Sequence, residues 1–145
     1  MDIFRTVATF VWFLQQCITV GGLGILWFAV PFVLLCATLV FLFLKMPNEA
    51  RLRLPVLLTL PVLWMFEGFW GAYFWLEWQN PKAHNPPWTE WIPQYGFWTF
   101  LAVALLLLVY LRGSRIFAAL FTLMNGYFML GMSFLSGMAV TGAWL

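Results

Sequence analysis

Glu67 is the residue of this chain with the clearest potential for chemistry. It lies near the middle of an apolar stretch from Pro55 to Trp78, which is long enough to cross a bilayer because a spanning helix needs about 20 residues. Inserting a carboxylate at that depth costs about 2.5 kcal/mol or more, so the side chain should face protein or water rather than lipid. It could bind a proton, a cation or a ligand, join two helices through hydrogen bonds, or pair with a cation of another subunit.

Few polar side chains could accompany Glu67 inside the membrane. Every Lys and Arg lies at the end of an apolar stretch or beyond it, so the sequence offers no cation at the same depth. The remaining candidates for an ion or ligand site are Asn125, Thr122, Tyr73 and Gln16. A buried amide such as Asn125 also commonly bridges helices, with a contribution of about 0.6 kcal/mol.

Aromatic residues surround Glu67 on every face of its helix. Among them, Trp64, Trp70 and Phe74 could line a site for a lipid tail, a quinone or another flat apolar ligand. Aromatic residues also serve as plain packing or as lipid-facing surface. Because they occur on all faces, the pattern does not predict a one-sided pocket.

Small residues recur on one face of the last apolar stretch. Ser133, Gly137 and Thr141 follow one another at four-residue steps, a spacing that lets two helix backbones approach closely. We therefore expect a helix-contact face here, either within the bundle or with a partner.

Sequence patterns typical of catalysis or metal binding are absent. His84 is the only histidine, Cys17 and Cys36 have no CxxC spacing, and no cluster of His, Cys and carboxylates has the spacing of metal ligands. The sequence contains no Gly-rich phosphate loop, no GxSxG and no HExxH. We predict no catalytic residue, no metal and no cofactor, and we do not expect an enzyme.

The composition indicates a membrane protein. Of the 145 residues, 64% are hydrophobic and only 8% are charged, whereas soluble domains carry about 25% charged residues. A soluble fold of this size would lack the polar surface to cover its core. No basic run is dense enough to indicate nucleic-acid binding, so the expected partners are membrane lipids and other membrane subunits or further copies of this chain.

The predicted fold is an all-α membrane bundle of one domain, residues 1–145. We expect four spanning helices and a loop rich in Trp and Pro, with no regular helix through most of the loop. The spans are placed at 23–44, 55–78, 95–111 and 116–140, and the loop at 79–94. Residues 3–19 carry a mildly polar stripe that favours an amphipathic helix in the membrane interface, and a short fifth span is the alternative.

The distribution of cations predicts an orientation. Lys and Arg concentrate in two short connections, 45–53 and 112–115, which the positive-inside rule places in the cytoplasm. The loop 79–94 and the C-terminus are then external. A bacterial inner membrane is the expected location.

We expect a small non-catalytic subunit of a larger plasma-membrane complex, such as a respiratory or transport assembly. One alternative is a homo-oligomeric channel or transporter that uses Glu67 as its proton or cation site, with Asn125 assisting. Another is a lipid- or quinone-binding protein that uses the aromatic residues. The sequence does not decide among these three functions.

Overall fold

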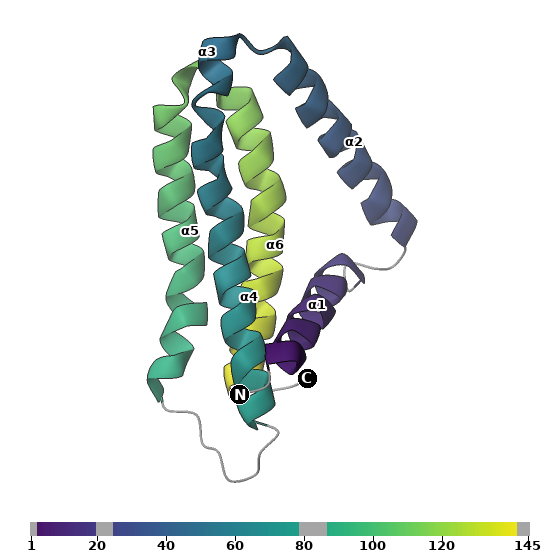
Figure 1. Cartoon of the computed structure of the whole chain (residues 1–145), viewed down its shortest axis with the longest axis vertical. Coiled ribbons are helices and arrows are strands. Elements are labelled where there is room, and N and C mark those ends of the chain that lie inside the picture. The colour runs from purple at the N-terminus through teal and green to yellow at the C-terminus, as the bar shows by residue number, and fades with distance from the viewer. Residues whose placement is uncertain (1–2, 20–24, 79–86, 142–145) are drawn as a thin grey trace.

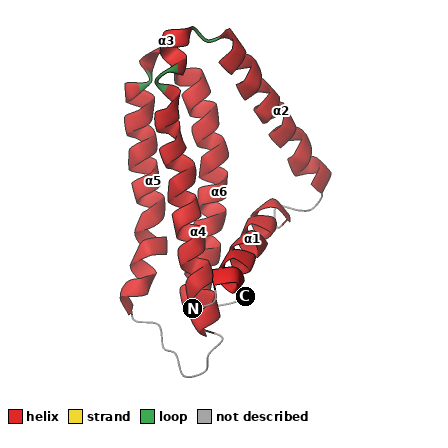
Figure 2. Ribbon diagram, in the orientation of Figure 1, coloured by secondary structure: helices red, strands yellow, loops and turns green. Residues whose placement is uncertain are grey.

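The computed structural model describes residues 3–19, 25–78 and 87–141, and this part of the chain is almost entirely helical, with no strand (Figure 2). The all-α prediction is therefore confirmed for the described residues. The α-helices are α1 (Ile3–Thr19), α2 (Ile25–Lys45), α3 (Asn48–Arg51), α4 (Thr59–Trp78), α5 (Trp91–Tyr110) and α6 (Arg115–Thr141). Single 3-10 turns are found at η1 (Leu54–Leu58), η2 (Pro87–Glu90) and η3 (Arg112–Ser114).

Helices α4, α5 and α6 form the body of the molecule. They run side by side and alternate in direction, since α3 precedes α4 at the same end where α5 turns into α6 (Figure 1). Leu60 of α4, Phe100 of α5 and Ala118 of α6 are buried in one apolar cluster between them. Helix α6 packs against both of the others, and the site described below lies along it.

Three segments are long and apolar enough to cross a membrane: Asn48–Trp75, Trp88–Tyr110 and Arg112–Thr141. The described part of α2 adds a shorter apolar helix, Pro31–Lys45. Length and composition thus support a membrane protein with three spanning helices, while a fourth span through α2 stays a prediction.

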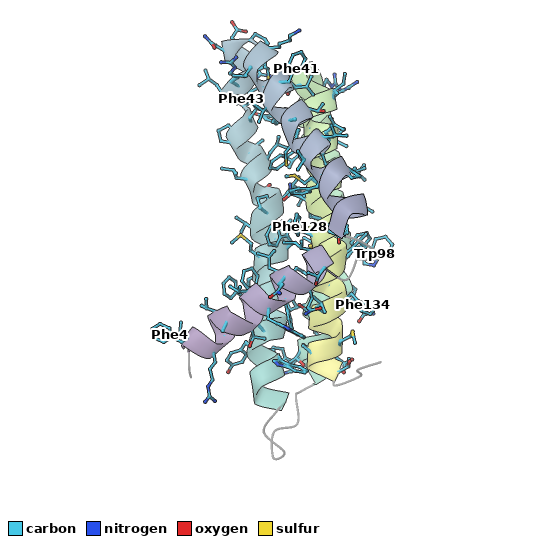
Figure 3. The ribbon with its side chains drawn as sticks, turned by 90° about the vertical axis from the view of Figure 1, so that its right-hand side faces the viewer. Phe4, Phe41, Phe43, Trp98, Phe128 and Phe134 are labelled. Carbon is cyan, nitrogen blue, oxygen red and sulfur yellow. The ribbon has the colours of Figure 1, made fainter. Side chains whose placement is uncertain are left out.

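Helix α1 lies obliquely across α4 and α6 (Figures 1 and 3). Its buried face consists of Thr6, Phe10, Phe13 and Cys17, which recur at three- and four-residue steps. Phe10 stacks on Phe69 of α4 with the ring centroids 4.0 Å apart. The predicted helix over residues 3–19 is therefore present, and it is docked on the bundle along one face.

The loop predicted over residues 79–94 is shorter in the structure. Residues 87–90 form η2 and α5 already begins at Trp91, before the span that was expected to begin at Tyr95. Pro93 is compatible with this early start because it lies in the first turn, where a helix needs no backbone N–H donor. Residues 79–86 lie outside the described residues.

Helix α2 leans away from the other helices and returns to them at the end where α3 begins (Figure 1). Arg51 of α3 holds this end, since its guanidinium donates hydrogen bonds to the carbonyl oxygens of Phe43 at 3.0 Å and Leu44 at 2.6 Å. These are carbonyls of the last turn of α2, which have no partner within the helix. A cation at this position also interacts favourably with the helix dipole.

Candidate functional site

Glu67 lies inside the bundle. Its residue is 1% exposed, so the side chain faces the neighbouring helices and not the lipid. It precedes Trp75, at the end of the candidate span, by about 12 Å along the helix axis. In a bilayer whose hydrocarbon core, about 30 Å thick, ends near Trp75, the carboxyl group would lie well inside that core.

The carboxyl group of Glu67 fits into a space that exists because residue 96 of α5 is glycine. A Cβ atom at Gly96 would lie 2.5 Å from Glu67 Oε2 and 2.9 Å from Cδ, which is closer than such atoms can approach. Any other residue at position 96 would therefore displace the carboxyl group. Gly96 brings the backbone of α5 into direct contact with the acid.

Two serines of α6 border the same site. The Ser136 hydroxyl donates a hydrogen bond of 2.7 Å to the backbone carbonyl of Glu67, and Ser136 is fully buried. The contact is close because Gly71 lies opposite, where an added Cβ would stand 2.6 Å from Ser136 Cα. Ser133, one turn before Ser136, places its hydroxyl near the carboxyl group itself.

Within the described part of the chain, Ser133 comes near the carboxyl group, but no side chain reaches it with hydrogen-bond geometry. Among the described residues, neither Glu67 oxygen is hydrogen-bonded, and the buried Ser133 hydroxyl has no partner either. An ionised carboxylate in such a place is strongly disfavoured, because no described side chain compensates its charge. The group is therefore neutral in this closed arrangement, or it takes up a ligand that supplies the missing partners.

The polar residues expected to accompany Glu67 lie elsewhere. Asn125 is buried, but its Oδ1 accepts a hydrogen bond of 2.9 Å from Trp64 Nε1, and its amide donates to the Phe121 carbonyl at 2.8 Å. Asn125 thus links α6 to α4, about two turns from Ser133 along the helix. It is held by aromatic and backbone groups and does not join a shared site.

The other three candidates are also separate from the carboxyl group. Thr122 borders an apolar pocket shared by α2, α5 and α6. Tyr73 lines a shallower pocket beneath α1, and Gln16 is half-buried on α1. The structure therefore does not gather the predicted polar residues around Glu67.

The three aromatic candidates do not form a common ligand site. Trp64 stacks on Phe128 at 5.3 Å, whereas Trp70 packs on Phe74 at 5.0 Å and on Trp88 at 5.9 Å. Trp70 Nε1 also donates a hydrogen bond to the Thr89 carbonyl, which fixes η2 against α4. Trp70 also lines the pocket beneath α1 to which Tyr73 belongs, so these aromatic residues pack in separate places.

The small-residue face of α6 is turned toward the bundle along part of its length. Ser133 is at the carboxyl group, and the nearest atom to a Cβ at Gly137 would be Pro93 of α5, at 3.9 Å. Thr141 is exposed and donates to the Gly137 carbonyl. Ser133 and Gly137, the first two residues of this face, thus contact other helices of the same chain.

Sequence reasoning missed Gly96, Ser136 and Gly71. Gly96 lies against the Glu67 side chain, Gly71 lies against Ser136, and Ser136 donates a hydrogen bond to the Glu67 backbone carbonyl. Small residues at such facing positions let helices approach closely. Comparing the small positions of α4, α5 and α6 with each other would have pointed to them. The described residues contain no group of three or more His, Cys, Asp or Glu that could hold a metal ion.

Comparison with known proteins identifies no relative: no family model, no curated protein and no solved structure matches the chain. The functional argument therefore rests on the geometry around Glu67.

Proposed function

We propose that this chain is a small integral membrane protein of proton- or cation-coupled transport, in which Glu67 takes up and releases the coupling ion. The observation that carries the proposal is the absence of a hydrogen-bond partner for either Glu67 oxygen among the described residues. Ionisable residues within spanning helices generally mark ion pathways or proton relays. A carboxyl that served only to join helices would be hydrogen-bonded to them.

The surroundings of Glu67 suit a small ion better than a larger ligand. Gly96 lies against the carboxyl group and Ser133 beside it, so the site has room for a proton or a small bare cation. In the closed arrangement the carboxyl is protonated, and rotation of Ser133 would let its hydroxyl oxygen accept the proton in a hydrogen bond. Release then requires water or a second polar group to reach the carboxyl as the helices move apart.

A second candidate is a subunit of a larger membrane complex, and one observation favours it. The larger pockets in the described part of the chain lie beneath α1 and beside α2, and Glu67 borders none of them. A path from water to the carboxyl group would then need a surface supplied by a partner, such as a respiratory or transport subunit or a second copy of this chain.

Ion flux through liposomes that contain only this protein tests the first candidate. The purified chain is reconstituted with a pH-sensitive dye trapped inside, and flux is measured under an imposed proton or cation gradient. The wild type should dissipate the gradient, and Glu67→Gln should not, because the amide cannot exchange a proton. Glu49→Gln is the matched control, since Glu49 is exposed on α3.

Flux in Glu67→Gln equal to that of the wild type would refute the ion-site assignment. If the wild type itself shows no flux, the proposal that this chain transports ions by itself is wrong. Purification in mild detergent then decides the second candidate, which requires other polypeptides in fixed stoichiometry. A homogeneous preparation of this chain alone would exclude it.

A further inference from the structure

A large apolar pocket lies between α2, α5 and α6. It has a volume of about 570 Å³, within the range of sites that hold small molecules. Phe32 and Leu35 of α2, Phe100 and Leu101 of α5, and Leu123 and Leu130 of α6 belong to its wall. Glu67 is not part of it, so an inference about this pocket is independent of the proposed function.

The wall of the pocket is almost entirely apolar. Its Thr122 hydroxyl is buried and has no hydrogen-bond partner among the described residues. The Tyr127 hydroxyl is engaged elsewhere, since it donates a hydrogen bond to the carbonyl of Cys17 in α1. A quinone has two carbonyl groups, and Thr122 could serve only one of them, so the other would stay without a partner at a cost of about 1–3 kcal/mol. A plain hydrocarbon chain has no such cost.

The pocket opens sideways toward the surface that faces the membrane. Leu101, Leu123 and Leu130 belong to its wall and are 39%, 69% and 56% exposed. A hydrocarbon chain can therefore enter laterally from the bilayer. In doing so it would fill the pocket beside α2, the helix that leans away from the others (Figure 1).

The contact between α2 and α6 extends from this pocket to the basic end of the molecule. Phe43 of α2 contacts Phe117 of α6 with centroids 6.4 Å apart, and Phe32 contacts Phe128 at 6.2 Å (Figure 3 labels Phe43 and Phe128). The two contacts are about 16 Å apart along each helix, so the helices are antiparallel in matched register. Lys45 lies just beyond the first contact.

Lys45 ends α2 and Arg115 begins α6, and both are exposed. Arg112, in the turn before α6, is exposed at the same end (Figure 1 shows where α6 begins). Neither sequence connection is dense enough in cations to hold an anionic lipid, but the fold brings the two connections to one end. An anionic headgroup would be attracted there, about 10–15 Å from the pocket wall at Leu35 and Thr122.

From the apolar wall, the lateral opening and the cations at the end of the contact between α2 and α6, we propose that this pocket binds one acyl chain of an anionic phospholipid. The phosphate lies at the basic end beside α2 and α6, and the chain runs along the outer edge of their contact and enters the pocket from the side. The bound chain supplies packing that α2 lacks within the protein. The lipid thereby fixes α2 against α6.

Lipid retained through purification tests the proposal. The protein is reconstituted in vesicles of equal phosphatidylglycerol and phosphatidylcholine, extracted in mild detergent, and its bound phospholipid is measured by native mass spectrometry. The wild type should retain one phospholipid per chain, enriched several-fold in phosphatidylglycerol. Gly126→Leu should lose it, because a Cβ at Gly126 meets only ordinary contacts, at 3.6 Å from Phe100, and the longer side chain fills the pocket.

Two further variants separate the tail from the headgroup. Gly137→Leu makes the same change on the same helix outside the pocket, where the nearest atom is Pro93 at 3.9 Å, and should retain the lipid. Lys45→Gln with Arg115→Gln should retain a phospholipid without the preference for phosphatidylglycerol. Equal retention in Gly126→Leu and the wild type would overturn the pocket assignment, and an unchanged preference in the double variant would overturn the headgroup assignment.

Photo-crosslinking of the wild type keeps the test independent of whether any variant folds. Phosphatidylglycerol with a diazirine in its acyl chain should label peptides that contain residues 97–101 and 122–130. Labelling spread evenly over the exposed apolar surface would overturn the proposal. Recovery of a bound quinone, or of a dimer that contacts through residues 122–130 and excludes lipid, would also overturn it.

Discussion

Replacing Gly96 by alanine tests the position of the carboxyl group more directly than replacing the acid itself. The added Cβ would lie 2.5 Å from Glu67 Oε2 and 3.1 Å from Oε1, so the carboxyl group must move. Overpacking of a well-filled interior costs typically about 1–3 kcal/mol. The flexible side chain of Glu67 can rotate away but has no polar partner to meet, so we expect Gly96→Ala to destabilise by about 1–2 kcal/mol.

A double-mutant cycle isolates the contact between residues 96 and 67. In the background Glu67→Ala the carboxyl group is gone, and Gly96→Ala should then cost nothing or even stabilise by filling space. The coupling free energy between the two sites is therefore about 1–2 kcal/mol, as expected for residues in contact. Gly126→Ala serves as the control, because its Cβ would be 3.6 Å from the nearest atom and needs no movement.

The assay is equilibrium unfolding of the four proteins of the cycle in mixed detergent micelles, followed by tryptophan fluorescence. An equal cost of Gly96→Ala in both backgrounds would show that the carboxyl group does not lie against α5. The description of the site would then be wrong.

Three other substitutions follow from the same packing, each measured by the same unfolding assay. Gly71→Ala should destabilise by more than about 2 kcal/mol, since its Cβ would meet the backbone of Ser136 and only movement of a helix relieves that; a loss below 0.5 kcal/mol contradicts the close approach. Trp64→Phe should cost about 0.6–2 kcal/mol because Asn125 Oδ1 loses its donor, and an unchanged stability contradicts that hydrogen bond. Glu67→Met should stabilise by about 1–3 kcal/mol while abolishing flux, because it removes an unpaired buried polar group; a clear destabilisation would mean that the carboxyl is hydrogen-bonded after all.

Hydropathy and periodicity predict the helices of this chain well because these signals depend on local sequence. Helix α1 has the predicted bounds, Ile3–Thr19, and α6 runs from Arg115 to Thr141 where a span over 116–140 was predicted. The predicted start of α5 is four residues too late, because the four prolines of residues 79–94 argue against a regular helix there, whereas proline is tolerated in the first turn of a helix, where Pro93 lies.

The partners of Glu67 could not be predicted in the same way. They depend on how each helix is rotated about its axis, and apolar residues on all faces of α4 and α5 give no information about that rotation. By polarity alone, Asn125 is the expected partner of Glu67. In the structure its amide oxygen instead accepts a hydrogen bond from Trp64, which lies one turn from Glu67 on the same helix. The small residues Gly96 and Ser136 carry that information instead, since a helix can approach closely only where both surfaces are small.

The cations illustrate a second limit. Each basic connection alone has too few charges to indicate a lipid headgroup site, and only the fold shows that Lys45 and Arg115 lie at the same end of the contact between α2 and α6. Sequence distance gives no measure of such proximity. The proposed lipid site therefore required the structure.

The protonation state of Glu67 in a lipid bilayer is the measurement that tests the central claim most directly. Infrared spectra of the wild type and Glu67→Gln in the same membranes, subtracted from one another, isolate the signal of this one carboxyl group. The account predicts a C=O stretching band of a protonated, weakly hydrogen-bonded carboxylic acid at neutral pH in the wild type, absent in the variant. A difference spectrum that shows only the bands of an ionised carboxylate would contradict it, because a charged Glu67 must have partners that this arrangement does not provide.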